Sequence, residues 1–291
     1  MKNYLLFMSF LCTVHCVVGQ WTQQGADING EAVNNYSGSS VSLSNDGSRI
    51  AIGAYGNADN GVFSGHVRIY EFNGANWMQL GADINGEAAD DRSGWSSSLS
   101  GDGSRVAIGA YWNDGGGNNS GHVRIYEFNG VNWVQLGTDI NGAGAGGQSG
   151  WSVSISDNGS RVAIGAPQNS GGGAVSGHVR IYEFNGVNWV QLGTDIDGEA
   201  AGDWSGYSVS LDSNGNRVAI GAIYNDGGFG GGSGHVRIYE YNGANWVQLG
   251  NDIDSERPDD EFGSSVSISD NGNRVAIGAP QNDDNGTASG H

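Results

Sequence analysis

Short runs of alternating apolar and polar residues dominate the chain after residue 20, and they predict β-strands throughout. In the third of several similar repeats the runs are WSVSIS (151–156), RVAIGA (161–166), HVRIYEF (178–184) and WVQLG (189–193). The turn DNGS joins the first two runs and NGVN joins the last two, and both contain residues that tolerate positive φ in tight hairpins. Since no segment shows helical periodicity, each repeat is predicted to be a four-stranded antiparallel unit with strands a, b, c and d.

These units recur at a constant period. A histidine opens strand c and a tryptophan opens strand d, at intervals of 56 or 57 residues: His66, His122, His178 and His235, and Trp77, Trp133, Trp189 and Trp246. Four antiparallel strands at such a period are typical of a propeller blade. A β-solenoid is the weaker alternative, because its coils are usually shorter and lack two tight hairpins per period. The predicted fold class is all-β, a β-propeller built from four-stranded antiparallel blades of about 56 residues.

One stretch of each repeat resembles a known family. The segment FGSSVSISDNGNRVAIGAP (262–280) and its counterparts at 149–167 and 205–223 resemble the FG-GAP repeat of integrin α-subunit propellers and of many secreted bacterial proteins. The resemblance covers residues 21–291 and implies a secreted propeller, which in integrins has seven blades. In that family the calcium loop lies on the a–b hairpin, between FG and GAP. Here that hairpin is a short turn such as SDNGNR, so the family's metal sites do not carry over.

The two ends of the chain differ from the repeats. Residues 1–19 combine Lys2 with an apolar stretch and a small residue before Gln20, which predicts a signal peptide and a secreted or cell-surface protein. Residues 20–291 then hold the propeller repeats: a d-type strand at Trp21, four full blades, and strands a and b of a further unit. Because a ring closed from these parts would lack one strand c, we expect the chain to be a fragment of a longer propeller.

Charge narrows the choice of partners. The 291 residues include 31 acidic and 12 basic ones, which gives a formal net charge of −19. A surface this negative disfavours nucleic acid and anionic membranes, and no membrane insertion is expected after signal cleavage. Cations and extracellular glycans or proteins are the expected partners.

The loops at one end of the blades vary between repeats. The b–c and d–a loops differ in length and composition, whereas the a–b and c–d turns are nearly identical. Variable loops on a rigid scaffold are where binding usually resides. Aromatic residues recur at the variable positions: Tyr36, Tyr55, Trp95, Tyr111, Trp112, Trp151, Trp204, Tyr207 and Tyr224. These rings are predicted to stack on a glycan or on protein side chains; the alternative is that they fill gaps between blades.

The same loops carry regularly spaced oxygen groups. The d–a loop reads DINGEAADD from Asp83 and DIDGEAAGD from Asp195, with oxygen groups at positions 1, 3, 5 and 9. Calcium takes roughly six to eight oxygen ligands, and such alternation can direct them inward. The calcium ligands predicted by this spacing are Asp27, Asn29, Glu31, Asp83, Asn85, Glu87, Asp91, Asp195, Asp197, Glu199, Asp203, Asp252, Asp254, Glu256 and Asp260. The loop from Asp139 lacks two of the acidic groups and is not expected to bind. The alternative is a solvated acidic loop whose first Asp caps a turn.

Signals for catalysis are absent from the sequence. The histidines that follow the predicted signal peptide share one repeat position, and the arginines of strands b and c repeat likewise, so structural roles are expected for both. We therefore predict that the protein is not an enzyme. It is expected to be a secreted, noncatalytic propeller that binds a glycan or protein through the b–c and d–a face, with calcium as the candidate cofactor. The alternatives are a structural array or spacer of a larger surface protein and, weakest, a glycan-active enzyme that uses loop carboxylates.

Overall fold

The structure is a computed structural model in which residues 21–227 and 230–291 are described. These residues form 22 β-strands, and they include no helix long and apolar enough to cross a membrane. The predicted signal peptide, residues 1–19, lies outside the described residues.

Four consecutive repeats each form a five-stranded antiparallel sheet, and we call these sheets blades 1 to 4. Blade 1 contains β1 (Ser40–Leu43), β2 (Arg49–Ala54), β3 (His66–Phe72), β4 (Trp77–Gln79) and β5 (Ile84–Asn85). Blade 2 contains β6 (Ser96–Leu99), β7 (Arg105–Ala110), β8 (His122–Phe128), β9 (Trp133–Gln135) and β10 (Ile140–Asn141). Blade 3 contains β11 (Ser152–Ile155), β12 (Arg161–Ala166), β13 (His178–Phe184), β14 (Trp189–Gln191) and β15 (Ile196–Asp197). Blade 4 contains β16 (Ser205–Leu211), β17 (Arg217–Ala222), β18 (His235–Tyr241), β19 (Trp246–Gln248) and β20 (Ile253–Asp254). A two-stranded sheet of β21 (Ser265–Ile268) and β22 (Val275–Gly278) follows.

The fifth strand of each blade was not predicted. In blade 1, β3 pairs with β2 along its whole length. On its other edge, β3 pairs with β4 near its C-terminal end and with β5 at its N-terminal end, where Asn85 lies opposite His66. The break between β4 and β5 includes Gly81, whose φ is +77°. The Asp-Ile-Asn segment, predicted as the start of a metal loop, therefore ends in a short strand that continues strand d.

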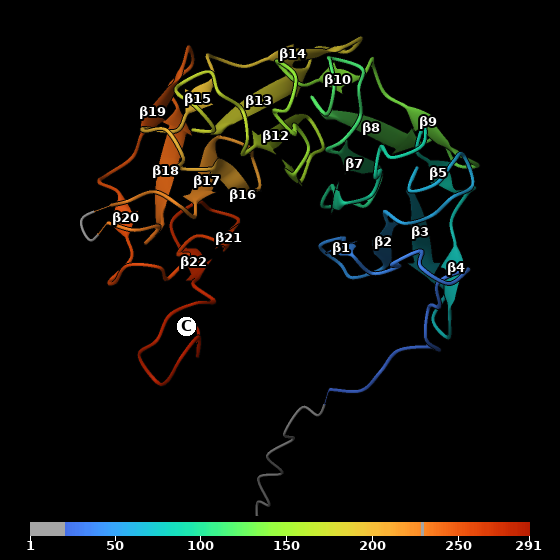
Figure 1. The fold of residues 1–291 in the computed structure, drawn as a ribbon. Coiled ribbons are helices and arrows are strands. Elements are labelled where there is room, and N and C mark those ends of the chain that lie inside the picture. The colour runs from blue at the N-terminus through green and yellow to red at the C-terminus, as the bar shows by residue number, and fades with distance from the viewer. Residues whose placement is uncertain (1–20, 228–229) are drawn as a thin grey trace, which may run out of the picture.

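The blades lie side by side in an open arc, with β1 and β16 toward its inner edge and β4, β9, β14 and β19 toward its outer side (Figure 1). Successive first strands contact one another, from β1 against β6 to β16 against β21. Radially arranged antiparallel sheets of this kind confirm the predicted propeller-like fold.

The d-type strand predicted at Trp21 is wrong. Residues 21–24 form no strand, and Trp21 is fully exposed. Strand d of a blade pairs with strand c, and the described residues offer no unpaired strand c beside Trp21. The repeat-like sequence alone is therefore not enough to form the strand.

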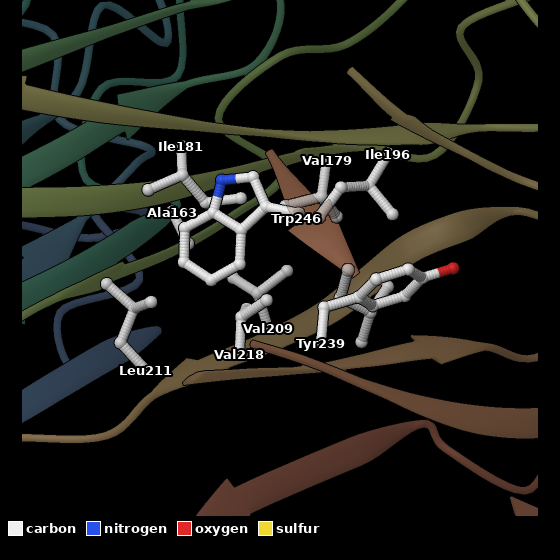
Figure 2. Close-up of a cluster of buried hydrophobic side chains, with 10 residues drawn as sticks. Ala163, Val179, Ile181, Ile196, Val209, Leu211, Val218, Tyr239 and Trp246 are labelled. Atoms are coloured by element: carbon white, nitrogen blue, oxygen red, sulfur yellow. The ribbon is translucent and has the colours of Figure 1, made fainter. Parts of the chain in front are cut away.

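The hydrophobic cores lie between neighbouring blades. Between blades 3 and 4, Trp246 of β19 packs in a cluster of ten buried residues that includes Ala163 and Ile181 of blade 3 and Val209 and Val218 of blade 4 (Figure 2). Equivalent clusters lie between blades 1 and 2, between blades 2 and 3, and between blade 4 and the β21–β22 sheet. A single blade would expose this apolar surface, so each blade depends on its neighbours for stability.

The arginine that opens strand b connects each blade to the next. Arg105 donates from Nε and Nη2 to Glu127 of its own blade, at 2.9 and 2.8 Å, and from Nη1 to the carbonyl oxygen of Gly159 in blade 3, at 3.0 Å. Its guanidinium also lies 5.5 Å from the centroid of the Phe184 ring. We expect Arg105→Lys to lower the free energy of unfolding by about 1–2 kcal/mol, because lysine cannot make all these contacts at once. Urea denaturation followed by tryptophan fluorescence measures this loss.

Arg274 provides the matched control. It occupies the same repeat position, but it is exposed, and its side chain donates no hydrogen bond within residues 21–227 and 230–291. Arg274→Lys should change the free energy of unfolding by less than about 0.5 kcal/mol. Equal losses for the two variants would contradict the role given to the contacts of Arg105.

Candidate functional site

The predicted aromatic residues form one continuous row across the blades. They lie where strand b ends and strand a begins, either beside the Ser-Gly pair that precedes strand a or directly after strand b. Ring contacts with centroids 4.7–6.4 Å apart connect all of them: Tyr36, Tyr55, Trp95, Tyr111, Trp112, Trp151, Trp204, Tyr207 and Tyr224. We call this set the aromatic row. The fold thus brings together residues from four separate repeats.

Exposure varies along the aromatic row, and six of its nine residues are partly buried. Tyr36 and Tyr224, at its two ends, are 52% and 39% exposed, whereas Tyr111 near its middle is 3% exposed. Trp112 is covered by the guanidinium of Arg92, which lies 3.4 Å from the centroid of one of its rings. The ends of the row can therefore contact a ligand, while Tyr111 and Trp112 pack within the protein.

The residue before each of the first four Ser-Gly pairs of this face has a left-handed backbone, although it is not glycine. The φ angle is +52° at Tyr36, +57° at Arg92, +58° at Gln148 and +57° at Trp204. Bulky residues rarely adopt this conformation, which costs on the order of 1 kcal/mol. The position therefore keeps a large and variable side chain on this face at an energetic cost.

The oxygen groups of a single d–a loop are not brought together. Asp83 lies beside His66 of blade 1, whereas Glu87 of the same loop lies beside His122 of blade 2. Between these two positions the chain passes from one blade to the next. The ligands that spacing assigned to one loop are thus divided between two blade junctions.

Each of these junctions combines one carboxylate from each of two successive d–a loops with the histidine that opens strand c. The clusters are Glu31, Asp59, His66 and Asp83; Glu87, His122 and Asp139; and Glu199, His235 and Asp252. We call them junction clusters 1, 2 and 4, after the blade that supplies the histidine. In each, the histidine Nδ1 lies 3.7–4.0 Å from one oxygen of both loop carboxylates, which is too far for a hydrogen bond.

Neighbouring side chains orient the carboxylates of the junction clusters. Gln79 donates to Oδ1 of Asp83 at 2.5 Å, and Oδ2 of Asp83 is the oxygen nearest His66. Arg68 lies 3.3 Å from Oε1 of Glu31, and Oε2 is again the oxygen nearest the histidine. The same two kinds of contact recur in clusters 2 and 4. One oxygen of each carboxylate is therefore held by a partner while the other faces the imidazole.

Burial keeps these histidines neutral. It is the largest cause of the lowered pKa of His66, His122 and His235, and it brings the pKa of His122 to about 4. The strand arginine lowers the pKa further, while the nearby carboxylates oppose the shift. A neutral imidazole can present a lone pair at Nδ1, which a protonated ring cannot.

Junction 3 differs because Ala143 stands where the other four d–a loops have Glu87 or its equivalent. Arg180 instead contacts Asp195, donating to both of its oxygens at 2.9–3.1 Å. His178, Asp195 and Asp197 also bring potential ligand atoms within 4.8 Å of one another. Both carboxylates belong to the same loop, however, and Arg180 already pairs with Asp195. This junction therefore has the histidine without the same carboxylate environment.

The carboxylates at position 9 connect loops. Asp91 is buried and accepts hydrogen bonds from the backbone nitrogen of Ala88 at 3.0 Å and from Asn113 Nδ2 at 3.1 Å. Asp203 and Asp260 are also buried and accept hydrogen bonds from their own d–a loop and from the following b–c loop. These three side chains lie outside the junction clusters.

Three other predicted ligands are in the first and last d–a loops. Asp27 accepts a hydrogen bond from Gln23 at 2.7 Å, and the backbone carbonyl of Asn29 accepts one from Arg68 at 2.9 Å. Glu256 is exposed. The side chains of Asp27 and Glu256 belong to none of the metal-sized groups found among the described residues.

Three of the four predicted ligands at position 3 lie in the short fifth strands. Asn85, Asp197 and Asp254 are each opposite the histidine of their blade. Asp254 also lines an acidic hollow of about 370 Å³ together with Glu199 and Asp252 of junction cluster 4. This hollow gives the cluster an opening to solvent.

The histidines are the candidates that sequence interpretation missed. Their constant repeat position indicated a structural role, and burial agrees with that role. The overlooked signal is that each histidine of clusters 1, 2 and 4 lies between a loop glutamate and the first aspartate of the next loop. The repeat that lacks the glutamate is also the one in which the arginine changes partner.

Comparison with known proteins identifies the repeat. The family model of the FG-GAP repeat matches residues 85–126 and 255–291. No curated protein sequence matches the chain.

Two solved structures have a similar fold. A protein from Bacteroides uniformis described as a "putative 6-phosphogluconolactonase" is 14% identical, with a TM-score of 0.56 over 86% of this chain and 69% of that one. A functionally unknown protein from Desulfotomaculum acetoxidans is 13% identical, with a TM-score of 0.53 over 81% of this chain and 61% of that one. At these identities the similarity concerns the fold alone.

Proposed function

Because this chain is an FG-GAP repeat protein with a propeller-like fold, we propose that it is a secreted, noncatalytic recognition protein that binds an extracellular glycan along the aromatic row. FG-GAP repeats are typical of extracellular proteins, which supports secretion. The continuous row of nine rings on the variable face is the observation that carries the proposal.

The chemistry of the face suits a carbohydrate. A sugar ring presents C–H groups to an aromatic face and hydroxyl groups to polar neighbours. Tyr36 and Tyr224 offer exposed rings, and the d–a loops supply carboxylate and amide groups on the same face. Since the row runs from blade 1 to blade 4, the ligand is expected to be a chain of several sugars. A protein ligand that uses the same rings is the alternative occupant.

The backbone at the row supports a role in binding. Tyr36 and Trp204 keep their strained left-handed conformations although glycine would relieve them. Strain of this kind is commonly retained where a side chain has a task other than stability. The repetition of histidine, arginine and acidic residues in successive blades supports a noncatalytic role, because a catalytic centre needs a group that departs from the repeat.

The test uses the two exposed ends of the row. Tyr36→Ala and Tyr224→Ala should each weaken binding to a long polysaccharide about fivefold, because one stacking contact contributes about 1 kcal/mol. The double variant should lose roughly 30-fold, since the two sites lie far apart and their effects add. Affinity electrophoresis of the purified protein in gels containing soluble polysaccharides measures the retardation.

The control for this test is Val187→Ala. Val187 is 72% exposed and lies in the turn between β13 and β14, at the opposite end of the strands. Its substitution should leave the retardation unchanged. The glycan proposal would be overturned if the double variant were retarded as strongly as the wild type. It would also be overturned if no polysaccharide retarded the wild type. If the wild type binds an extracellular protein and the double variant does not, the protein ligand would be favoured over the glycan.

A further inference from the structure

We propose that junction clusters 1, 2 and 4 each bind a divalent transition-metal ion, best matched by zinc, through histidine Nδ1 and one carboxylate oxygen from each of two successive d–a loops. The ligands would come from strand c of one blade and from the loops on either side of it. This inference is independent of the glycan proposal, because it concerns other side chains and can be measured without any glycan.

In junction clusters 1 and 4 the buried histidine has an unused polar atom that faces the carboxylates. His66 and His235 are each 1% exposed, and their Nδ1 atoms have no hydrogen-bond partner among the described residues. A buried polar atom without a partner destabilises the folded state. Each of these Nδ1 atoms nevertheless lies 3.7–3.9 Å from two carboxylate oxygens. A cation between the three atoms would satisfy all of them.

The spacing of these atoms fits a shared ion. Nitrogen and oxygen ligands of tetrahedral zinc lie about 2.0–2.2 Å from the ion and therefore about 3.4 Å from each other. The observed distances of 3.7–4.0 Å exceed this value by only a few tenths of an ångström. In each cluster all the ligand atoms lie within 4.8 Å of one another. Binding would require small side-chain adjustments and no movement of the blades.

Neighbouring side chains hold the proposed ligands in place, as they do around metal ions in proteins. Gln79 holds Asp83 and Arg68 contacts Glu31, so each carboxylate presents a defined oxygen toward His66. Outer contacts of this kind orient metal ligands and strengthen binding. The carboxylates are partly exposed, with 22% and 40% of the side-chain surface accessible for Asp83 and Glu31. An ion can therefore enter from solvent while the histidine remains buried.

The ligand set favours zinc over calcium. Calcium selects oxygen ligands, whereas an imidazole nitrogen with two carboxylates is a common zinc combination that leaves a position for water. In cluster 1, Asp59 adds a third carboxylate. Its three carboxylates against Arg68 give a formal charge of −2, which matches a divalent ion. Cluster 1 is therefore expected to bind most tightly.

Junction 3 is not expected to bind an ion. Its loop has Ala143 in place of the glutamate, and Asp195 is engaged by Arg180 at 2.9 Å. His178 is buried like the other histidines and has carboxylate oxygens of Asp195 and Asp197 at 3.5 and 4.0 Å. It therefore tests whether a buried histidine suffices when both carboxylates come from one loop and one of them is paired with an arginine. We expect three ions per chain, not four.

The experiment uses tag-free protein, stripped of metal with EDTA and then titrated calorimetrically with zinc chloride, with calcium chloride in a parallel titration. Zinc should bind with a stoichiometry of about three, and calcium should not compete at equal concentration. Glu87→Gln should reduce the zinc stoichiometry by about one while leaving the circular dichroism spectrum unchanged, because the Glu87 side chain is 42% exposed. His122→Gln should cause the same loss of zinc stoichiometry. When cobalt is titrated in place of zinc, this variant should show less visible cobalt absorption than the wild type.

Junction 3 supplies both the control and a gain of function. His178→Gln should leave the zinc stoichiometry at about three. Ala143→Glu should raise it to about four, because residue 143 is exposed and the new carboxylate can draw Arg180 away from Asp195. The proposal is overturned if zinc does not bind, if Glu87→Gln binds as many ions as the wild type, if His178→Gln loses as much as His122→Gln, or if calcium binds equally well.

Discussion

Gly165→Ala should lower the free energy of unfolding by about 3 kcal/mol or more, although it adds a single methyl group. A Cβ atom on Gly165 would lie 2.1 Å from the carbonyl oxygen of Gly206 in blade 4 and 2.3 Å from Ser152 Oγ. Ser152 Oγ also donates to the Gly206 oxygen at 2.8 Å, so the methyl group would enter a hydrogen bond that joins two blades. The backbone of blade 4 would have to move away from blade 3. Urea denaturation of wild type and variant measures the loss.

Gly144→Ala is the matched control for this prediction. An added Cβ on Gly144 meets no atom within 4 Å, and its backbone is not left-handed. This substitution should be neutral or stabilise by up to about 1 kcal/mol, because alanine has less freedom than glycine in the unfolded chain. A loss for Gly165→Ala no greater than that for Gly144→Ala would show that the two blades can separate at little cost.

This close contact explains the two glycines of the FG-GAP motif. Gly263 follows Phe262 and supplies the FG of its repeat, while Gly221 supplies the GA of the preceding repeat. A Cβ atom on Gly221 would lie 2.1 Å from the carbonyl oxygen of Gly263. The two parts of the motif therefore meet across a blade boundary. Regular alternation predicts the strands within a repeat, but it does not show which glycine touches the next repeat.

The strands that sequence predicted best are those whose signals are local. The runs 161–166 and 178–184 match β12 and β13 at both ends, because alternation and turn residues mark them within a few positions. The two-residue strand β15 was missed. Its pairing with β13 depends on strand d being interrupted at Gly193, and a run of two residues has no measurable period.

In the acidic loops, spacing along the chain did not predict how the residues group in space. Asp83, Glu87 and Asp91 follow one another in one loop, but the structure gives them three environments: one junction cluster, the next junction cluster, and a buried contact between loops. Spacing along an extended loop assumes that one ion lies beside it. Here the loop crosses from one blade to the next, so each group meets partners from a different repeat. Calcium binding by these loops stays a prediction.

For the aromatic row, the sequence predicted which residues lie together but not how deeply each is buried. Position in the repeat correctly indicated that the rings share one face, and the structure adds their mutual contacts. It could not reveal that Tyr111 is buried while Tyr36 is exposed, because both occupy variable positions of the same face. That difference depends on two tryptophans that pack against Tyr111: Trp95 of the same blade and Trp151 of blade 3.

Trp246→Ala should lower the free energy of unfolding by about 3–5 kcal/mol, which is a large part of the roughly 5–15 kcal/mol typical of a folded domain. Trp246 fills the core between blades 3 and 4 (Figure 2). Its Nε1 donates to the carbonyl oxygen of Leu192 at 2.8 Å. Alanine would leave a cavity at the boundary on which both blades depend. Trp246→Phe should lose less, about 1–2 kcal/mol, because it keeps most of the ring and removes the hydrogen bond. Denaturant unfolding of the two variants separates the packing contribution from the hydrogen bond.

Trp77 shows whether the effect comes from the boundary between blades. It occupies the same repeat position in β4, and its Nε1 donates to the carbonyl oxygen of Gln24 at 3.0 Å, but it is only half-buried and belongs to none of the cores between described blades. Trp77→Ala should therefore cost clearly less than Trp246→Ala, because little apolar surface is uncovered. If the two losses were equal, tryptophan would stabilise each blade from within, and the blades would not depend on their neighbours. A larger loss at Trp246 would mean that the stability of this protein is concentrated at the contacts between repeats, where the FG-GAP glycines and the junction histidines also lie.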